Sequence, residues 1–209
     1  MPQIQFRSRL YFVANAASAP ASALLLQVDA AVAGGAGLVQ YVPGNQTTRE
    51  MVALAMELVM RCRKSQIPLI IDGRVDVALA TTAAGVHLCC EDMPVAIARR
   101  MLGPNATVGV TIRSLADARE AERQGASYLG VGPIFPTLDM PGLALGTRVI
   151  EELAAATSLP VCAMGGITLD NAIQLSHTPA ALIAVTCSLS SARAAQRAAH
   201  SLAQRLQLA

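Results

Sequence analysis

Short apolar runs alternate along this chain with longer segments in which apolar and polar residues recur at helical spacing. Eight runs have the length and composition of strands: 10–14, 37–42, 68–71, 85–88, 107–110, 128–131, 161–164 and 181–185. A predicted helix follows each run: 21–33, 48–65, 75–81, 94–102, 114–125, 146–156, 168–176 and 192–206. Because the runs lack a polar face, they are typical of strands buried on both sides in a parallel sheet.

Start signals and a weak internal repeat support this order. Thr47 or Thr48 with Glu50 marks the start of one helix, and Ser114 with Asp117 marks another. Small residues lead from a helix into a strand four times, at 34–39, 83–88, 124–129 and 179–183. Eight βα units without a linker predict one domain over residues 1–209, a closed (β/α)8 TIM barrel. A doubly wound open sheet is the alternative.

Two apolar runs end in glycines where a turn must begin, in the stretches 128–137 and 161–168. In a barrel of this class, ligands bind at the carboxyl ends of the strands, and phosphate often binds after the last two strands. Those two loops hold Gly165-Gly166 and Cys187-Ser188. The glycines can turn backbone N–H groups toward an anion, and a helix beginning at Thr168 would add its dipole. Alternatively, the glycines only form a tight turn.

Composition excludes several classes of protein. Hydrophobic residues make up 53% of the chain, but every long apolar stretch is broken by Gly, Pro or charge, so we predict no membrane span. The start of the chain lacks a secretory signal, and we expect a cytoplasmic location. A net charge of +2, scattered basic residues and 3% aromatic residues argue against nucleic-acid binding.

The positions of the lysine and of the cysteines argue against several further kinds of site. Lys64 is the single lysine and lies in a predicted helix, which excludes a P-loop lysine and a lysine Schiff base. Five cysteines without Cys-x-x-Cys spacing argue against a disulfide framework or a structural zinc site. We expect reduced thiols, with reactivity of the adjacent pair Cys89-Cys90 as the alternative.

Four motifs carry a resemblance to a known family: Pro-Leu-Ile-Ile-Asp-Gly-Arg-Val-Asp-Val-Ala-Leu at 68–79, Gly-Val-His-Leu at 85–88 with Glu-Asp-Met-Pro at 91–94, the stretch 128–137, and Met-Gly-Gly-Ile-Thr at 164–168. From residue 10 to about residue 189 the chain resembles the thiamine phosphate synthases and the related thiazole tautomerases. The resemblance implies a homodimeric barrel that binds a phosphorylated thiazole. The synthase reaction joins this thiazole to a pyrimidine diphosphate and releases pyrophosphate, with Mg²⁺ as cofactor.

The resemblance also assigns roles to residues. The residues that match its thiazole-phosphate site are Thr137, Gly165, Gly166, Cys187 and Ser188. Gln40 matches a catalytic glutamine, and Thr111 replaces a serine while keeping the hydroxyl. Asp92 matches a carboxylate that helps to hold magnesium, with a helix N-cap as the alternative role.

The pyrophosphate side departs from the family pattern. Val42 and Gly44 stand where the family has arginine and lysine, and Asp72-Gly73 stands where it has Asn-Asp, which weakens the magnesium site. In the loop after the sixth strand, Asp139 and Met140 replace a hydroxyl residue and a lysine. Each lost charge-assisted contact costs on the order of a few kcal/mol, so we expect this half of the site to be degraded.

Several residues of the predicted site have two alternative roles. Asp72 and Arg74 fall on the pyrimidine and pyrophosphate side, and Arg74 and Arg113 are candidate replacement cations, although we expect Arg74 to pair with Asp76. Asp139 is either a general base or an exposed loop acid. His87 is either a core residue of the barrel or a base.

Gly73-Arg-Val-Asp76 also matches the tautomerase branch, whose acid–base histidine is replaced here by Arg113. The main hypothesis is a synthase-like transferase. The alternatives are a tautomerase-like isomerase with another acid, and a non-catalytic barrel that binds a thiamine-pathway metabolite or a protein partner.

Overall fold

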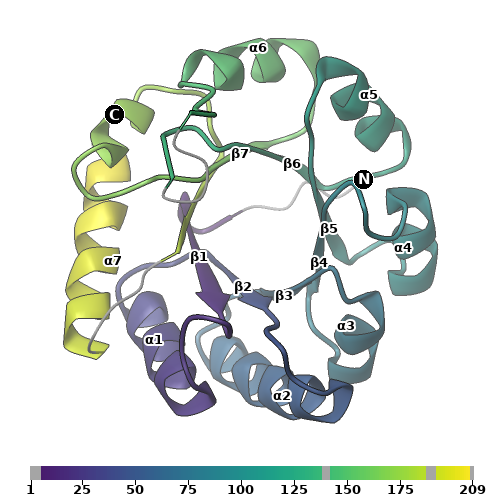
Figure 1. Cartoon of the computed structure of the whole chain (residues 1–209), viewed down its shortest axis with the longest axis vertical. Helices are drawn as coiled ribbons and strands as arrows, with labels where there is room; N and C mark the ends of the chain where they lie inside the picture. The colour runs from purple at the N-terminus through teal and green to yellow at the C-terminus, as the bar shows by residue number, and fades with distance from the viewer. Residues whose placement is uncertain (1–5, 138–141, 187–191, 208–209) are drawn as a thin grey trace.

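Eight parallel strands close into a barrel in chain order, with β8 pairing to β1, in a computed structural model that describes residues 6–137, 142–186 and 192–207 (Figure 1). The strands are β1 Leu10–Asn15, β2 Leu38–Val42, β3 Leu69–Asp72, β4 Gly85–Leu88, β5 Thr107–Thr111, β6 Tyr128–Val131, β7 Val161–Met164 and β8 Leu182–Thr186. The predicted (β/α)8 barrel is confirmed, and the open sheet is excluded because β1 and β8 form a parallel ladder.

The helices form a ring outside the strands (Figure 1). They are α1 Ala21–Ala33, α2 Thr48–Lys64, α3 Val75–Thr81, α4 Val95–Leu102, α5 Leu115–Arg123, α6 Arg148–Ala156, the 3-10 helix η1 Ala172–Leu175, and α7 Ala192–Gln207. The predicted start signals act as expected. Thr47 and Glu50 form a capping box on α2, and the Ser114 side chain accepts from the Asp117 N–H at the start of α5. No described helix has the length and apolar character of a membrane span.

The segment 168–176 differs from the prediction of a helix. Thr168 Oγ1 accepts from the Asn171 N–H, and Asn171 Oδ1 accepts from the Thr168 N–H, the reciprocal pair of a capping box, but no α-helix follows. Only the four residues Ala172–Leu175 then form a 3-10 turn. The helix dipole predicted at Thr168 is therefore absent from this site.

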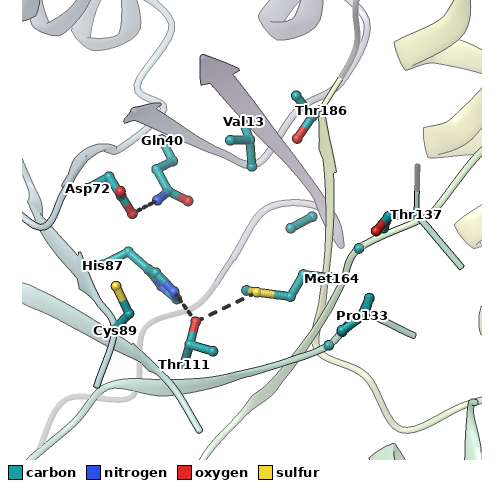
Figure 2. A pocket seen from close by; sticks show the side chains of 13 residues that line it. Val13, Gln40, Asp72, His87, Cys89, Thr111, Pro133, Thr137, Met164 and Thr186 are labelled. Carbon is teal, nitrogen blue, oxygen red and sulfur yellow. Dashed lines mark hydrogen bonds between the residues drawn. The ribbon is translucent and has the colours of Figure 1, made fainter. Parts of the chain in front are cut away.

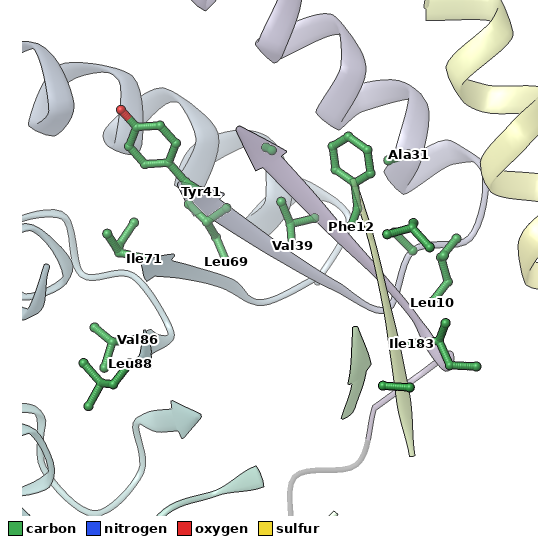
Figure 3. Close-up of a cluster of buried hydrophobic side chains, with 14 of the residues drawn as sticks. Leu10, Phe12, Ala31, Val39, Tyr41, Leu69, Ile71, Val86, Leu88 and Ile183 are labelled. Carbon is green, nitrogen blue, oxygen red and sulfur yellow. The ribbon is translucent and has the colours of Figure 1, made fainter. Parts of the chain in front are cut away.

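Alternation along each strand divides the apolar residues into two cores. The outward residues pack against the helices in the larger core (Figure 3), and those labelled on the first four strands are Leu10, Phe12, Val39, Tyr41, Leu69, Ile71, Val86 and Leu88. The inward residues form a smaller core inside the barrel: Tyr11, Leu38, Ile70, Tyr128, Cys162, Leu182 and Ala184. Because successive side chains point to opposite faces, the next inward position toward the carboxyl end of each strand faces the mouth of the barrel.

Arg9 ties the amino-terminal end of the barrel together. Its guanidinium, half-buried just before β1, donates hydrogen bonds of 2.9–3.3 Å to five backbone carbonyls, those of Leu175, Ser176, Thr178, Ala180 and Leu206. These carbonyls belong to η1, the β8 approach and α7, so one side chain joins three segments that are distant from it in sequence.

Replacing Arg9 with Met should lower the free energy of unfolding by about 2–4 kcal/mol, because five carbonyls lose a charged donor in a water-poor site. Urea denaturation measures the change. Arg7→Met is the matched control, since exposed Arg7 donates to one side chain among the described residues, that of Gln66, and it should cost less than about 0.5 kcal/mol. Equal losses in the two variants would contradict this role of Arg9.

Candidate active site

A cavity of about 350 Å³ opens at the carboxyl ends of the strands (Figure 2), a size that suits a small-molecule ligand. It is lined by Val13, Gln40, Asp72, His87, Cys89, Thr111, Gly132, Pro133, Thr137, Met164, Gly165, Ala184 and Thr186. Asp72, Gln40 and His87 lie on one side, whereas Thr137 and Pro133 lie on the other. Among the residues described, no lysine or arginine lines the cavity.

A continuous row of hydrogen-bonded side chains forms the floor and one wall of this cavity. We call it the polar row, and it consists of Asp72, Gln40, Tyr11, Tyr128, His87 and Thr111. Gln40 Nε2 donates to Asp72 Oδ1 at 2.5 Å, and Tyr11 Oη donates to Gln40 Oε1 at 2.6 Å. The two tyrosine hydroxyls lie 3.1 Å apart.

The row continues from Tyr128 to the fifth strand. Its hydroxyl lies 2.7 Å from His87 Nδ1, and His87 Nε2 lies 2.8 Å from Thr111 Oγ1. In the described chain, no buried side-chain nitrogen or oxygen is left without a partner. A fully satisfied buried network of this kind holds its members in fixed positions.

A glycine on the neighbouring strand makes room for the central ring of the row. Gly109 of β5 pairs with Tyr128 of β6, and a Cβ atom at Gly109 would lie 2.0 Å from Tyr128 Cζ. The Tyr128 ring also stacks on His87, with centroids 5.6 Å apart. The absence of a side chain at Gly109 therefore positions Tyr128 beneath His87.

Burial shifts the ionisation of both titratable groups that face the cavity from the polar row. It raises the pKa of Asp72 to about 6, and the nearby Asp92 carboxylate adds to the rise, while the Gln40 hydrogen bond opposes it. Burial lowers the pKa of His87 to about 4, with Asp92 opposing. At neutral pH, Asp72 is therefore mostly ionised and His87 is neutral.

The glycine turn after β7 contributes backbone to the opposite side. Gly165 and Gly166 have φ of +85° and +69°, and a Cβ on Gly166 would lie 2.3 Å from the Phe135 carbonyl oxygen. Both positions therefore require glycine for packing alone. Within the described residues, neither N–H has a protein acceptor, so both amides are available to an anion. Gly165 lines the cavity, whereas Gly166 lies beside it.

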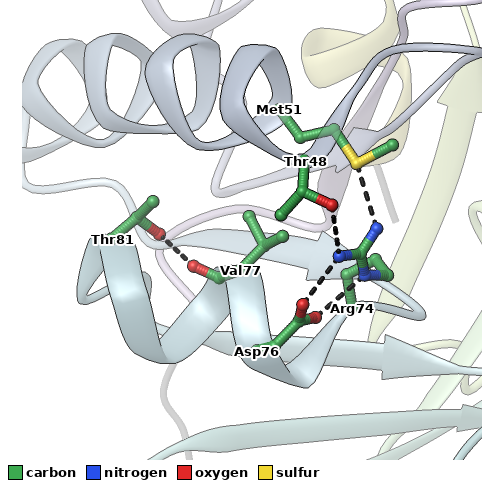
Figure 4. A network of polar contacts seen from close by, with 6 residues as sticks. All are labelled: Thr48, Met51, Arg74, Asp76, Val77 and Thr81. Atoms are coloured by element: carbon green, nitrogen blue, oxygen red, sulfur yellow. Dashed lines mark hydrogen bonds and ion pairs between the residues drawn. The ribbon is translucent and has the colours of Figure 1, made fainter.

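The two arginines predicted as replacement cations lie outside this cavity. Arg74 forms the expected ion pair with Asp76, at 2.6 and 2.8 Å, and also contacts Thr48 and Met51 of α2 (Figure 4). Exposed Arg113 lines a neighbouring groove together with Cys90 and Asp92. Arg74 thus joins α3 to α2, and neither guanidinium reaches the cavity wall.

Asp92 holds the turn after β4. Its Oδ2 accepts from the Cys89 N–H at 2.7 Å and from the Cys89 thiol at 3.0 Å. The alternative role as a helix N-cap is wrong, because Pro94 occupies that position in α4 without a side-chain cap. Burial, together with the bond to Asp92, raises the pKa of Cys89 to about 12, so this thiol stays protonated at neutral pH despite its exposure. This disfavours the hypothesis of a reactive Cys89.

Comparison with known proteins identifies the family. Residues 10–189 match the family model described as thiamine monophosphate synthase. The chain belongs to the thiamine monophosphate synthase family. It is 41% identical over 196 residues to a thiamine-phosphate synthase of Chloroflexus aurantiacus, covering 93% of this chain and 90% of the relative. A second thiamine-phosphate synthase, from Chlorobium luteolum, is 42% identical over 177 residues, covering 84% of each chain.

A solved structure agrees with this assignment. The structure of a thiamine phosphate pyrophosphorylase from Pyrococcus furiosus superimposes with a TM-score of 0.86 at 34% sequence identity, covering 97% of this chain and 96% of that chain. The barrel described above is therefore also the fold of a thiamine monophosphate synthase family relative.

Few candidate ligands for the expected magnesium ion lie close together among the described residues. Among the described residues, no group of three or more His, Cys, Asp or Glu side chains could hold a metal ion. Gly73, where the resemblance places a carboxylate, would direct a Cβ to within 3.1 Å of Asp92 Oδ1. Asp72 Oδ1 accepts from Gln40, and Asp92 Oδ2 accepts from Cys89, so one oxygen of each carboxylate is already hydrogen-bonded.

Some of the residues predicted for the site line the cavity, and others do not. The structure brings five of the predicted site residues together around the cavity: Gln40, Asp72, Thr111, Thr137 and Gly165. Asp139, Cys187 and Ser188 lie outside the described residues, and their predicted roles stay predictions. Sequence analysis missed Tyr11, Tyr128 and Met164. The available signal was period-two alternation, which places each of them on the inner face of its strand.

Asp72→Asn should stabilise the protein at neutral pH by about 1–3 kcal/mol. The folded-state pKa of Asp72 is raised, so its contribution to stability is complete below pH 4 and is lost as the pH rises through about 6. The difference in urea midpoint between variant and wild type should therefore shrink as the pH falls toward 4. A gain that does not depend on pH would contradict the assigned cause.

Proposed function

We propose that this protein is a synthase of thiamine phosphate that binds a phosphorylated thiazole well and the pyrophosphate of its second substrate weakly. The observation that carries the proposal is the asymmetry of the cavity. One side offers to an anion the amide of Gly165, which has no acceptor among the described residues, whereas the other side presents ionised Asp72. The names of the relatives, thiamine-phosphate synthases, support the reaction.

In the proposed reaction the bond between the pyrimidine carbon and the diphosphate oxygen breaks, and pyrophosphate leaves with the electron pair. The thiazole nitrogen then forms the new C–N bond with the resulting pyrimidine cation. Asp72 places a negative charge at the wall where this cation would form, which stabilises it electrostatically. Apolar Val13 and Met164 line the same cavity and help to exclude water from the cation.

The charges of the cavity wall also explain why we propose weak binding of the pyrophosphate. The cavity lining lacks a lysine or arginine among the described residues, and Asp72 repels a leaving anion. We propose that magnesium arrives on the diphosphate, with Asp92 as its one protein ligand, because Mg²⁺ commonly uses one or two carboxylates plus substrate phosphates. The homodimer that the resemblance implies and the cytoplasmic location expected from the sequence stay predictions.

A magnesium-dependent coupling assay with the pyrimidine diphosphate and the thiazole phosphate tests this function. Wild-type protein should turn over and require high magnesium. The double variant Asp72→Asn/Gly73→Asp restores the family's Asn-Asp pair and should raise kcat/KM about tenfold or more at low magnesium, because a second carboxylate then faces Asp92. Gly73 has φ of +63°, a conformation that aspartate tolerates better than most residues.

Adding Asp92→Asn to the double variant is the control, since it removes one of the two carboxylates and should abolish the gain. Absence of turnover in both the wild type and the double variant would contradict the proposal. If the thiazole phosphate still raised the melting temperature of the wild type, the result would favour the alternative of a metabolite-binding barrel.

The polar row favours a second candidate function, an isomerase that moves a proton on a thiazole carboxylate phosphate. Asp72 reaches the cavity, has a pKa near neutrality and lies at the end of a hydrogen-bonded row, which are the properties of a general acid–base. Arg113 has neither the position nor the chemistry for this role.

Solvent-deuterium exchange into the thiazole measures this activity by NMR. Asp72→Asn should reduce the exchange rate about 100-fold or more, whereas Arg113→Gln should leave it within about twofold of wild type. Exchange that fails to appear in the wild type, or that survives in Asp72→Asn, would eliminate this second candidate.

A further inference from the structure

While Asp72 is ionised, the hydrogen bonds of the polar row can be donated in only one direction, toward Asp72. A carboxylate accepts hydrogen bonds and cannot donate them, so the N–H₂ group of Gln40 must face Asp72. The Gln40 oxygen then faces Tyr11, whose hydroxyl proton is used in that bond. Tyr11 can therefore only accept from the hydroxyl of Tyr128, 3.1 Å away.

The same constraint passes along the second half of the row. Tyr128 has given its proton to Tyr11, so it must accept from Nδ1–H of His87. Neutral His87 carries one proton, which leaves Nε2 as an acceptor for the Thr111 hydroxyl at 2.8 Å. Thr111 Oγ1 gives its one proton to His87 at 2.8 Å rather than to Met164 Sδ at 3.8 Å, a weak acceptor, and so turns only lone pairs toward the cavity that it lines.

We propose that Asp72 is a specificity-determining residue that acts on the ligand through Thr111. By fixing the direction of the polar row, it makes the Thr111 oxygen a hydrogen-bond acceptor, which favours ligand N–H or O–H groups and disfavours phosphoryl or carboxylate oxygens at this wall. Asp72 is thus a positioning residue for a hydroxyl on a strand two removed from its own. The inference goes beyond the proposed function, because it holds for any ligand of the cavity.

A neutral amide at position 72 would permit the opposite direction. Asparagine can donate to the Gln40 oxygen, after which Gln40 donates to Tyr11, Tyr11 to Tyr128, and Tyr128 to His87 Nδ1. His87 would then carry its proton on Nε2 and donate to Thr111. The Thr111 proton would be released to a ligand, or to Met164 Sδ at 3.8 Å.

The tautomer of His87 reports the direction of the row. Protein labelled with ¹⁵N-histidine and observed by NMR at mildly alkaline pH should show wild-type His87 protonated on Nδ1. Asp72→Asn should shift the ratio of tautomers toward Nε2–H by about tenfold or more, since the bond to a charged acceptor is lost. Wild-type His87 protonated on Nε2, or a ratio unchanged in Asp72→Asn, would overturn the proposal.

Two further variants separate the effect of the hydrogen-bonded row from the effect of a negative charge alone. Asp92→Asn removes a neighbouring negative charge without touching any member of the row, and it should keep the wild-type tautomer. Gln40→Leu interrupts the row next to Asp72. It should shift the His87 tautomer ratio toward Nε2–H as Asp72→Asn does, and combining the two substitutions should give no larger shift. An equal shift in Asp92→Asn would overturn the proposal. Gln40→Leu also supplies the test if Asp72→Asn fails to fold.

The consequence for ligands is tested with inorganic pyrophosphate in the absence of metal. Asp72→Asn and Asp72→Asn/Thr111→Val carry the same charge at the cavity wall, but only the first keeps a hydroxyl that can donate. Titration calorimetry should therefore give about tenfold tighter binding to Asp72→Asn than to the double variant. Equal binding by the two variants, weak or strong, would overturn the assignment of ligand preference to Thr111.

Discussion

Closure of the parallel ladder between β1 and β8 is the constraint on which the rest of this structure depends. A closed sheet has an inside and an outside, and alternation then assigns every strand residue to one of them. The outward residues are apolar and bury the helices. The inward residues are apolar near the amino ends of the strands and largely polar near the carboxyl ends. The site is therefore a layer of the barrel interior rather than an addition to it.

That layer is unusual in the charge it presents. Asp72 is the acidic side chain among the described residues that line the cavity, and the described lining lacks a balancing cation. Partial burial near Asp92 makes its ionisation costly, as the raised pKa shows. The row of hydrogen bonds from Gln40 to Thr111 then spreads the influence of this charge over several strands. A single carboxylate thus sets both the electrostatics and the hydrogen-bonding direction of the wall.

Membership of the thiamine monophosphate synthase family and this altered wall are compatible. Family resemblance rests on motifs that build the barrel and the glycine turn, where Gly165 and Gly166 are required by the close approach of residues 133–136. The departures fall at Asp72 and Gly73, at the end of one strand, where side chains face a ligand rather than the core. Substitutions there leave the packing of the scaffold intact, so the family fold is compatible with the degraded half-site that the sequence analysis expects.

Patterns local to the chain were enough to predict the architecture. Apolar runs of strand length, glycine ends and capping residues such as Thr47 and Ser114 are local signals, and they placed all eight strands and most helices correctly. Local signals were misleading at 168–176, where Thr168 and Asn171 form the reciprocal bonds of a helix start but only the 3-10 helix Ala172–Leu175 follows. The expected pairing of Arg74 with Asp76 was also local, two residues apart in the chain.

The meeting of the polar groups depends on the closed barrel. Asp72, Gln40, Tyr11, Tyr128, His87 and Thr111 come from six different strands, and nothing in the sequence near Tyr11 indicates that its hydroxyl bridges Gln40 and Tyr128. Their contacts depend on the stagger between strands and on the space that Gly109 leaves for a ring. Burial, and with it the shifted pKa of Asp72 and of His87, likewise arises from barrel closure, which a linear pattern does not encode.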